Sequence, residues 1–136
     1  MLFRSVDSNI AIDVLTKDPA WLDWSVEALA KRTACGALCI NEVIYAELSI
    51  RMDSEAMLEE ALARLKLELT RIPRQALFVA GKIFPRYRAA GGVRTGVLPD
   101  FFIGAHAHVA KWPILTRDVR RFRTYFPDVE LITPNT

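Results

Sequence analysis

Short apolar runs alternate with longer segments of helical periodicity along the chain. The apolar runs predict strands at 2–6, 37–40, 69–72, 113–116 and 130–132. The periodic segments predict helices at 18–32, 41–48, 54–68, 74–89, from residue 100 onward, and at 119–125. Strands that alternate with helices in this way predict an α/β fold with a doubly wound, mostly parallel central sheet flanked by helices.

The bulk composition fits one compact domain that spans residues 1–136, since 51% of the 136 residues are hydrophobic and 25% are charged. The chain has no uncharged apolar run of about 18 residues, the length that a membrane-spanning helix requires. The first apolar run is short and is interrupted by Arg4, so we expect no signal peptide. A cytoplasmic protein without a membrane segment is therefore expected.

Cysteine and histidine residues are assigned structural roles in this interpretation. Cys35 and Cys39 flank a predicted turn and the start of an apolar run, which predicts buried, reduced thiols. His106 and His108 lie far apart around the helix that follows residue 100, so they are not expected to bind one metal ion together.

The net charge of +2 conceals an asymmetry between the two halves of the chain. Residues 1–70 hold 7 Lys and Arg against 12 Asp and Glu, a balance of −5, whereas residues 71–136 hold 11 against 4, a balance of +7. Asp100 and Asp118 are two of the few acids in the basic half. An anionic partner and an ordinary basic surface with acidic helix caps are both consistent with this pattern.

Four acidic residues lie where a parallel sheet would gather them. Asp7 and Asp118 closely follow predicted strands, Asp100 opens a helix, and Glu47 lies about two turns into its helix. Ligands of doubly wound sheets bind at the carboxyl ends of the strands, so we expect these side chains to converge there. Gly104, one turn after Asp100, is expected to leave open space beside it.

Clustered carboxylates repel one another unless protons or cations are present. Mg²⁺ and Mn²⁺ prefer carboxylate and water oxygens, and such ions support phosphodiester hydrolysis. Taken singly, each acid has an ordinary explanation as a helix cap, a turn residue or a surface charge. Their joint placement is what favours a metal site.

Four short segments carry a resemblance to a known family. They read VDSNI at 6–10, YAEL at 45–48, PDFFIGAHA at 99–107 and LTRD at 115–118, with Phe122 after them. In this order and at these distances they resemble the PIN-domain family, and above all the VapC ribonuclease toxins of bacterial toxin–antitoxin pairs. The resemblance covers nearly the whole chain.

The resemblance implies a magnesium-dependent endoribonuclease, with Mn²⁺ as a possible substitute ion. It implies that the enzyme cuts RNA, arrests growth and is held inactive by a cognate VapB-type antitoxin. It also implies a homodimer or a toxin–antitoxin hetero-oligomer. Trp21 and Trp24 are candidates for such contacts, because tryptophan is enriched at binding hot spots, although a core role fits them equally well.

Carried over by position, the resemblance makes Asp7, Glu47, Asp100 and Asp118 the catalytic and metal-binding residues. Thr116 matches the small hydroxyl residue before the last acid and would support the site by hydrogen bonding.

Three neighbours of these acids are given other roles. Ser8 and Asn9 would orient Asp7 rather than bind the metal. Arg117 stands where many relatives have asparagine, which leaves its role open.

Basic residues near the predicted site are candidates for contacts with RNA phosphates, which would make binding strongly salt-dependent. These residues are Arg86, Arg88, Arg94, Arg117 and Arg120. For Arg121 and Arg123 we prefer a solvated helix face.

Other function classes remain open from the sequence. One is a PIN-fold protein without a toxin role, acting in RNA processing or as an inert binding module. Another is an aspartyl-phosphate hydrolase with Asp7 as nucleophile. That chemistry would usually need a second acid two residues later, where this chain has Asn9.

Overall fold

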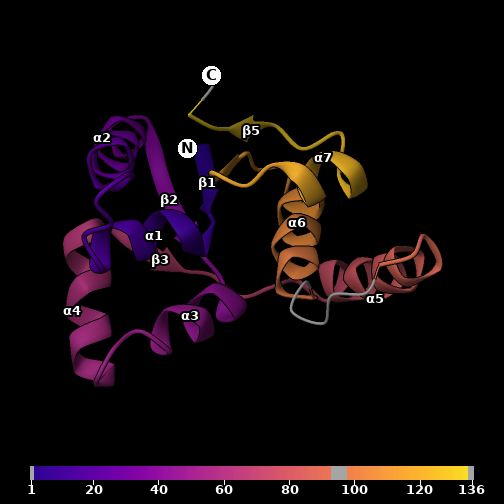
Figure 1. Ribbon diagram of the computed structural model, residues 1–136, viewed down its shortest axis with the longest axis horizontal. Helices are drawn as coiled ribbons and strands as arrows, with labels where there is room; N and C mark the ends of the chain where they lie inside the picture. The colour runs from indigo at the N-terminus through magenta and orange to yellow at the C-terminus, as the bar shows by residue number, and fades with distance from the viewer. Residues whose placement is uncertain (1, 93–97, 135–136) are drawn as a thin grey trace.

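The computed structural model describes residues 2–92 and 98–134, except for the side chains of residues 2 and 98. Within these residues the strands pair in parallel in one sheet, in the order β3-β2-β1-β4-β5. The strands are β1 (Leu2–Val6), β2 (Gly36–Ile40), β3 (Leu67–Leu69), β4 (Ile114–Leu115) and β5 (Leu131–Ile132). β1 therefore lies at the centre of the sheet (Figure 1). The parallel α/β sheet predicted from the sequence is confirmed.

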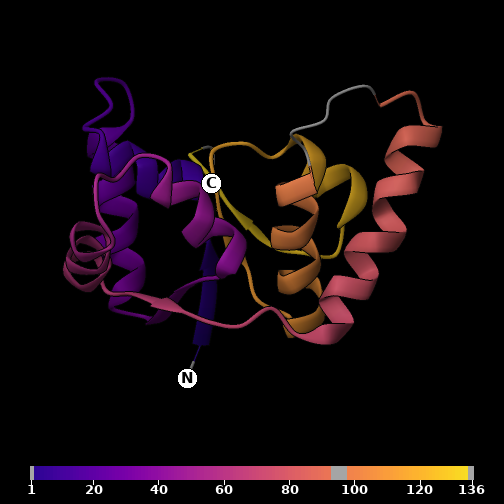
Figure 2. The same ribbon diagram turned by 90° about the horizontal axis from the view of Figure 1, so that it is seen from below.

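Helices flank this sheet on both sides. They are α1 (Ser8–Leu15), α2 (Leu22–Thr33), α3 (Glu42–Ser49), α4 (Glu55–Leu65), α5 (Arg74–Ala89), α6 (Leu98–Ala110) and α7 (Arg120–Tyr125). Two perpendicular views place α1, α2 and α4 on one side of β1, and α5, α6 and α7 on the other (Figures 1 and 2). No helix within the described ranges has both the length and the apolar character that a membrane crossing requires.

The carboxyl ends of β1 and β4 lie side by side, because Val6 pairs with Leu115. The backbone N–H of Asp7 donates to the carbonyl oxygen of Leu115 at 2.9 Å, which extends the pairing one residue past β1. The N–H of Thr116 donates to the carbonyl oxygen of Ile132 at 3.0 Å. These pairings bring Asp7 and segment 116–118 to the same edge of the sheet.

Helix α6 is the buried central helix that its apolar sequence predicted. Phe101 and Ile103 are fully buried, and they belong to the main hydrophobic core. The ring of Phe101 makes edge contacts with the rings of Phe84, Tyr87 and Tyr125. This packing fixes the first turn of α6 and therefore the position of Asp100.

Helix α1 is the main element that the sequence interpretation missed. The sequence interpretation places no element between the strand at 2–6 and the helix at 18–32, but the chain enters α1 at Ser8, directly after β1. Asp7 caps this helix, since the N–H of Ser8 donates to its carboxylate at 2.8 Å. Ile10 and Ala11 are fully buried and supply the packing that stabilises so short a helix.

The boundary between α4 and β3 also differs from the prediction. The expected helix at 54–68 ends at Leu65, because Lys66 adopts a left-handed conformation with φ of 57°. The next strand therefore spans Leu67–Leu69 instead of 69–72. Leu69, the last residue of this strand, is 52% exposed.

Two further expectations need correction. Cys39 in β2 is buried as predicted, but Cys35 is exposed in the turn before β2. Helix α2 begins at Leu22 and not at Asp18. The Asp18 carboxylate accepts hydrogen bonds from the N–H groups of Ala20 and Trp21, so it holds a turn that leads into the helix.

Candidate active site

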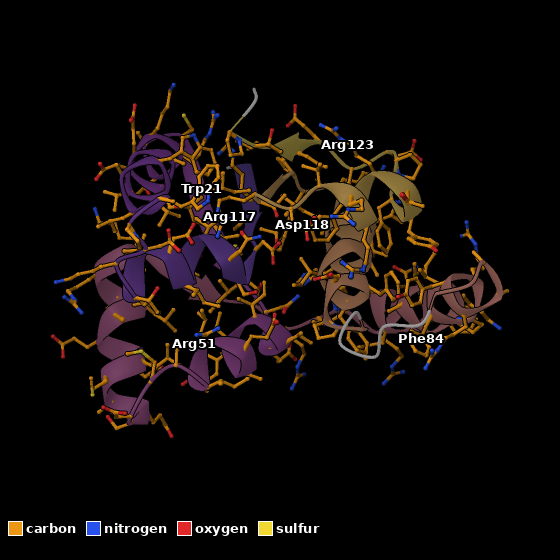
Figure 3. All side chains as sticks on the ribbon, in the orientation of Figure 1. Trp21, Arg51, Phe84, Arg117, Asp118 and Arg123 are labelled. Carbon is orange, nitrogen blue, oxygen red and sulfur yellow. The ribbon has the colours of Figure 1, made fainter. Side chains whose placement is uncertain are left out.

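A small pocket opens at the carboxyl ends of β1 and β4, with a volume of about 190 Å³. Its lining residues are Asp7, Ser8, Asn9, Asp100, Asp118, Arg121 and Phe122. Three of the four predicted carboxylates therefore face one pocket, although they come from segments far apart in the sequence. Figure 3 shows Asp118 at this edge of the sheet, between the helices of the two sides. We call this site the carboxylate pocket.

Asp7 is the most deeply buried acid of the pocket, with an exposed fraction of 4%. Burial raises the pKa of its carboxyl from 3.8 to about 7, against the lowering effect of a hydrogen bond from Thr116. The negative charges of Asp100 and Glu47 raise it further. The Asp7 carboxylate therefore lacks enough compensating positive charge in its surroundings.

Thr116 and Asn9 hold the Asp7 carboxylate in place. The hydroxyl of Thr116 donates to Oδ2 of Asp7 at 2.8 Å and accepts from the N–H of Asp118 at 3.1 Å. The side-chain amide of Asn9 donates to the same Oδ2 at 3.3 Å. Ser8 lies close as well, with its hydroxyl 3.5 Å from Oδ1 of Asp7. These contacts fix the orientation of Asp7 relative to Asp118.

Glu47 lies beside the carboxylate pocket without being one of its lining residues. Its carboxylate raises the pKa of Asp7, so the two side chains are near neighbours. Burial raises the pKa of Glu47 itself, and a hydrogen bond with Ser8 lowers it. Oε1 of Glu47 is buried and accepts no hydrogen bond from any residue that the structure describes. This oxygen is left available to a ligand.

Asp100 forms an ion pair inside the pocket. Nη1 of Arg121 lies 3.0 Å from Oδ2 of Asp100, and the two side chains are only 17% and 28% exposed. The expectation that Arg121 belongs to a solvated helix face is therefore wrong. The residue two positions further along α7, Arg123, is exposed as expected. No local sequence pattern separates these two arginines, because both lie on one short helix.

Asp118 is the most accessible acid of the pocket, since it is exposed, whereas Asp7 is buried and Asp100 is partly buried. Its Oδ1 accepts a hydrogen bond from the N–H of Arg120 at 3.3 Å, just before α7. Asp118 thus holds the turn that leads into α7, whose N-cap residue is Val119, and it also lines the carboxylate pocket. The two roles are compatible, because a carboxylate has lone pairs left for a second ligand.

Arg117 has a different environment from the other basic residues. Its guanidinium makes two contacts of 2.7 Å with the carboxylate of Asp13 and lies 4.8 Å from the ring centroid of Trp21. Oδ2 of Asp13 also accepts a hydrogen bond from the hydroxyl of Ser25 at 2.7 Å. Figure 3 shows Arg117 and Trp21 side by side. We call Asp13, Trp21, Ser25 and Arg117 the anchor cluster.

The remaining described candidates for RNA contact are not among the residues that line the pocket. Arg86, Arg88 and Arg120 are exposed. The guanidinium of Arg88 donates to the carbonyl oxygen of Gly92 at 3.2 Å. Arg94 lies outside the described residues. Arg117 is already paired with Asp13, so an RNA contact from its side chain would compete with that pair.

The carboxylate pocket does not form a preorganised metal cage. Within the described part of the chain, no three His, Cys, Asp or Glu side chains are close enough together to hold a metal ion. The expectation of four tightly clustered acids is therefore too strong. The donor set nevertheless fits a hard divalent cation, because Asp7, Asp100 and Asp118 offer carboxylate oxygens and Oε1 of Glu47 is unsatisfied.

Gly104 has a different function from the one expected. A Cβ at this position would overlap the ring of Phe126, so the glycine makes room for that ring and not for the pocket. His106 is a structural histidine, as predicted, with Nδ1 3.2 Å from the side-chain nitrogen of Asn41. His108 is exposed on the same helix.

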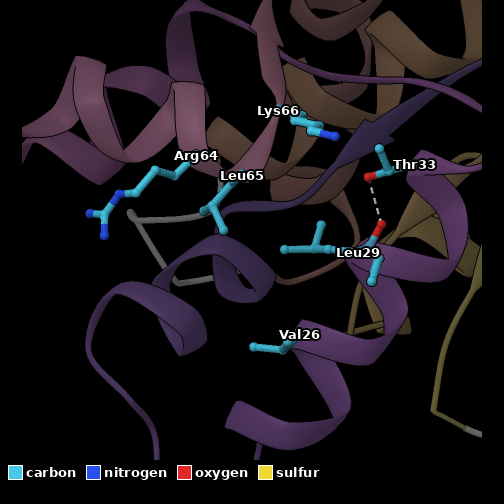
Figure 4. A pocket seen from close by; sticks show the side chains of 7 residues that line it. Val26, Leu29, Thr33, Arg64, Leu65 and Lys66 are labelled. Atoms are coloured by element: carbon cyan, nitrogen blue, oxygen red, sulfur yellow. Dashed lines mark hydrogen bonds between the residues drawn. The ribbon is translucent and has the colours of Figure 1, made fainter.

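A second hollow, of about 330 Å³, lies between α2 and α4 (Figure 4). Its lining residues are Val26, Leu29, Ala30, Thr33, Arg64, Leu65 and Lys66. It contains basic and apolar side chains but no carboxylate, so it lacks the chemistry of the carboxylate pocket. Trp21 and Trp24 are not among its lining residues, and their rings contact each other edge to face.

Comparisons with known proteins agree with this fold. The family model described as "PIN domain" matches residues 5–126. A search of curated proteins found no match.

Several solved toxin–antitoxin complexes have a similar fold. VapBC2 from Rickettsia felis, solved with a promoter DNA fragment, aligns with a TM-score of 0.69 and 18% identity over 97% of this chain and 98% of that chain. VapBC-1 from nontypeable Haemophilus influenzae aligns with a TM-score of 0.72 and 17% identity, over 99% of this chain and 100% of that chain. DNA-bound VapBC from Salmonella typhimurium aligns with a TM-score of 0.70 and 22% identity, over 98% of each chain.

Proposed function

The chain belongs to the PIN-domain family, and from that premise we propose that it is a metal-dependent endoribonuclease that acts as the toxin of a toxin–antitoxin pair. The observation that supports this proposal most directly is the convergence of Asp7, Asp100 and Asp118 on one pocket. The raised pKa of Asp7 and the unsatisfied oxygen of Glu47 indicate that these two carboxylates are not compensated by the positive charge of Arg121, which pairs with Asp100.

A divalent cation, Mg²⁺ or Mn²⁺, would supply the compensating charge. Asp7, Asp100 and Asp118 would bind it, with Glu47 as a fourth carboxylate from the adjoining side. When bound, such an ion provides a nucleophilic hydroxide and stabilises negative charge on the phosphate and the leaving oxygen.

The chain's own residues prepare the pocket for this ion. Thr116 and Asn9 both donate to Oδ2 of Asp7 and so fix the direction of its carboxylate. The rigid base of the pocket is β1 and β4, whose paired ends are held by backbone hydrogen bonds. This rigidity matters because small displacements of catalytic groups lower rates strongly.

RNA is the proposed substrate, and exposed arginines would bind its phosphates. Arg86 and Arg88 are exposed on α5, and Arg120 is exposed on α7, the helix that supplies Arg121 and Phe122 to the pocket. A small open pocket suits single-stranded or looped RNA, since the backbone of such RNA is accessible.

A VapB-type antitoxin is the proposed partner, in a homodimeric or hetero-oligomeric assembly. The similarity to VapBC complexes supports this proposal. Expression of the chain alone should arrest bacterial growth, and co-expression with the product of a neighbouring small reading frame should restore it. Normal growth without that product would favour a PIN-fold protein with another role.

The test of the activity uses purified protein stripped of metal with EDTA and then removed from the chelator. We expect cleavage of single-stranded RNA after addition of Mg²⁺ or Mn²⁺, none with EDTA present, and no release of phosphate from small phosphomonoesters. Phosphate release from the monoesters would favour the aspartyl-phosphate hydrolase. Metal-independent cleavage would contradict the proposal.

A further inference from the structure

Arg121 places a positive charge inside the carboxylate pocket. Its Nη1 lies 3.0 Å from Oδ2 of Asp100, and its side chain is only 17% exposed. The next residue, Phe122, is 2% exposed and belongs to the hydrophobic core. Because Phe122 fixes the rotation of α7, the direction of the Arg121 side chain toward the pocket is a consequence of the fold.

The Arg121 guanidinium contacts a carboxylate that a divalent cation in this pocket would also use. Oδ2 of Asp100 already accepts from Arg121, so a cation drawn to this carboxylate meets a positive charge at one of its two oxygens. A guanidinium and a divalent ion at one carboxylate also repel each other strongly at the reduced dielectric of a pocket. Binding of the metal and retention of the Arg121–Asp100 ion pair therefore oppose each other.

The displaced guanidinium would have an anionic ligand close by. Arg121 and Asp118 line the same pocket, so a phosphate drawn to the metal would lie within the range of this side chain. The planar guanidinium offers paired donors that match phosphate oxygens. Arg117 is less suited to this role, since both of its contacts with Asp13 are 2.7 Å long.

We propose that Arg121 is a catalytic residue with two positions: it neutralises Asp100 before metal binding, and it binds the RNA phosphate once a divalent cation has taken over Asp100. This inference rests on the proposed nuclease function. It adds a residue and an order of events, since the same side chain first competes with the cation and then assists it.

A purely structural ion pair makes the opposite prediction. If Arg121 only joins α7 to α6, its removal lowers the stability of the fold and leaves the affinity for metal unchanged or weaker. If Arg121 competes with the cation, its removal strengthens metal binding and weakens cleavage. Metal affinity and the rate of RNA cleavage therefore change in opposite directions only if the proposal is correct.

The first experiment is a titration of metal-free protein with Mn²⁺. The electron paramagnetic resonance signal of the free ion reports how much Mn²⁺ stays unbound. We compare the unaltered chain with Arg121→Gln, Arg121→Lys and the matched control Arg123→Gln, which removes an exposed charge from the same helix. Arg121→Gln should bind Mn²⁺ about five-fold more tightly, the equivalent of one lost ion pair. Arg121→Lys and Arg123→Gln should bind it as the unaltered chain does.

The second experiment measures cleavage of single-stranded RNA at saturating Mn²⁺. Arg121→Gln should cleave at least about ten-fold more slowly, because a charged donor to the phosphate is lost. Arg123→Gln should be unaffected. Unchanged or weaker Mn²⁺ binding by folded Arg121→Gln, or cleavage equal to that of the control, would overturn the proposal.

The two proposals fail in different ways. If the unaltered chain binds Mn²⁺ but cuts no RNA, the nuclease proposal is wrong, while tighter binding by Arg121→Gln still identifies the competing charge. If Arg121→Gln does not fold, Arg121→Lys keeps the test open. Lysine retains the charge but lacks the paired donors, so normal Mn²⁺ affinity with slower cleavage is expected, and unchanged cleavage would contradict the phosphate role.

Discussion

Two acidic regions lie close together at the carboxyl ends of β1 and β4. They differ in how far positive groups compensate their carboxylates. In the anchor cluster, Asp13 receives two contacts from Arg117 and a hydrogen bond from Ser25. In the carboxylate pocket, Asp100 receives a guanidinium contact from Arg121, and Asp7 is buried without an ion-pair partner among the described residues.

The difference shows what each region can do. A fully paired buried carboxylate resists new ligands, because any ligand would have to replace good existing contacts. A buried carboxylate that lacks a counter-charge attracts protons or cations. The anchor cluster is therefore structural and holds segment 116–118 against α1, whereas the carboxylate pocket is suited to binding a cation.

The largest expected effect comes from Asp100→Asn in the carboxylate pocket. We expect RNA cleavage to fall about a thousand-fold, the scale seen when a main electrostatic group of an active site is removed. Circular dichroism and thermal unfolding should show a folded protein. Asp128→Asn, which removes an exposed acid outside the pocket, is the control and should cleave normally. Near-normal cleavage by Asp100→Asn would contradict the assignment of the carboxylate pocket as the active site.

The next effect is on stability and comes from Arg117→Ala in the anchor cluster. Asp13 has a side-chain exposure of 2%, so it would be left as an uncompensated buried charge. We expect the free energy of unfolding to fall by about 3 kcal/mol, measured by urea denaturation. Arg123→Ala should change it by less than about 0.5 kcal/mol. A similar small change in Arg117→Ala would mean that the anchor cluster does not stabilise the fold.

The pH dependence of stability should separate the two regions in the presence of EDTA. The pKa of Asp7 is raised from 3.8 to about 7, so the folded state favours the protonated carboxyl. Its contribution is fully present below about pH 4 and is lost as the pH rises through about 7. Between pH 5 and pH 8 we expect the free energy of unfolding to fall by about 2 kcal/mol. Thermal unfolding experiments across this pH range measure the change.

Asp7→Asn is the matched variant for this pH prediction. An amide does not ionise, so the loss of stability between pH 5 and pH 8 should largely disappear in this variant. Added Mg²⁺ should also reduce the loss in the unaltered chain, by stabilising the charged carboxylate. If the unaltered chain and Asp7→Asn show the same pH profile, the uncompensated charge in the pocket does not control stability.

The smallest expected effect concerns Arg120, which takes part in neither the Arg117–Asp13 nor the Arg121–Asp100 ion pair. Arg120→Ala should weaken RNA binding by a few-fold and reduce the slope of log affinity against log salt by about 0.7, the value for one phosphate contact with a single strand. Binding is measured in Ca²⁺ with a fluorescent RNA, to slow cleavage. Arg51, exposed in the turn after α3, provides the control Arg51→Ala. Equal slopes for the two variants would remove Arg120 from the RNA surface.

The sequence was sufficient to predict the sheet and the convergence of three acids. Asp7 and Asp118 follow apolar runs, and parallel pairing brings the carboxyl ends of such runs together without further information. The apolar character of 101–105 likewise predicted that α6 is central. These conclusions depend on local patterns, which a single sequence records directly.

The pairings across the site could not be predicted in the same way. Arg117 and Asp13 are 104 residues apart, and nothing in either local pattern selects that partner. Arg121 and Arg123 differ only in the rotation of α7, which the burial of Phe122 determines. One signal was available and missed: Ile10, Ala11, Val14 and Leu15 have helical spacing and would have indicated α1.

The contact between Arg117 and Trp21 gives the molecule a natural optical reporter. An indole ring 4.8 Å from a guanidinium changes its emission when that charge moves. Since Arg117 lies between Thr116 and Asp118, the fluorescence of Trp21, isolated by replacing Trp24 and Trp112 with phenylalanine, would follow the motion of this segment in real time and without a label.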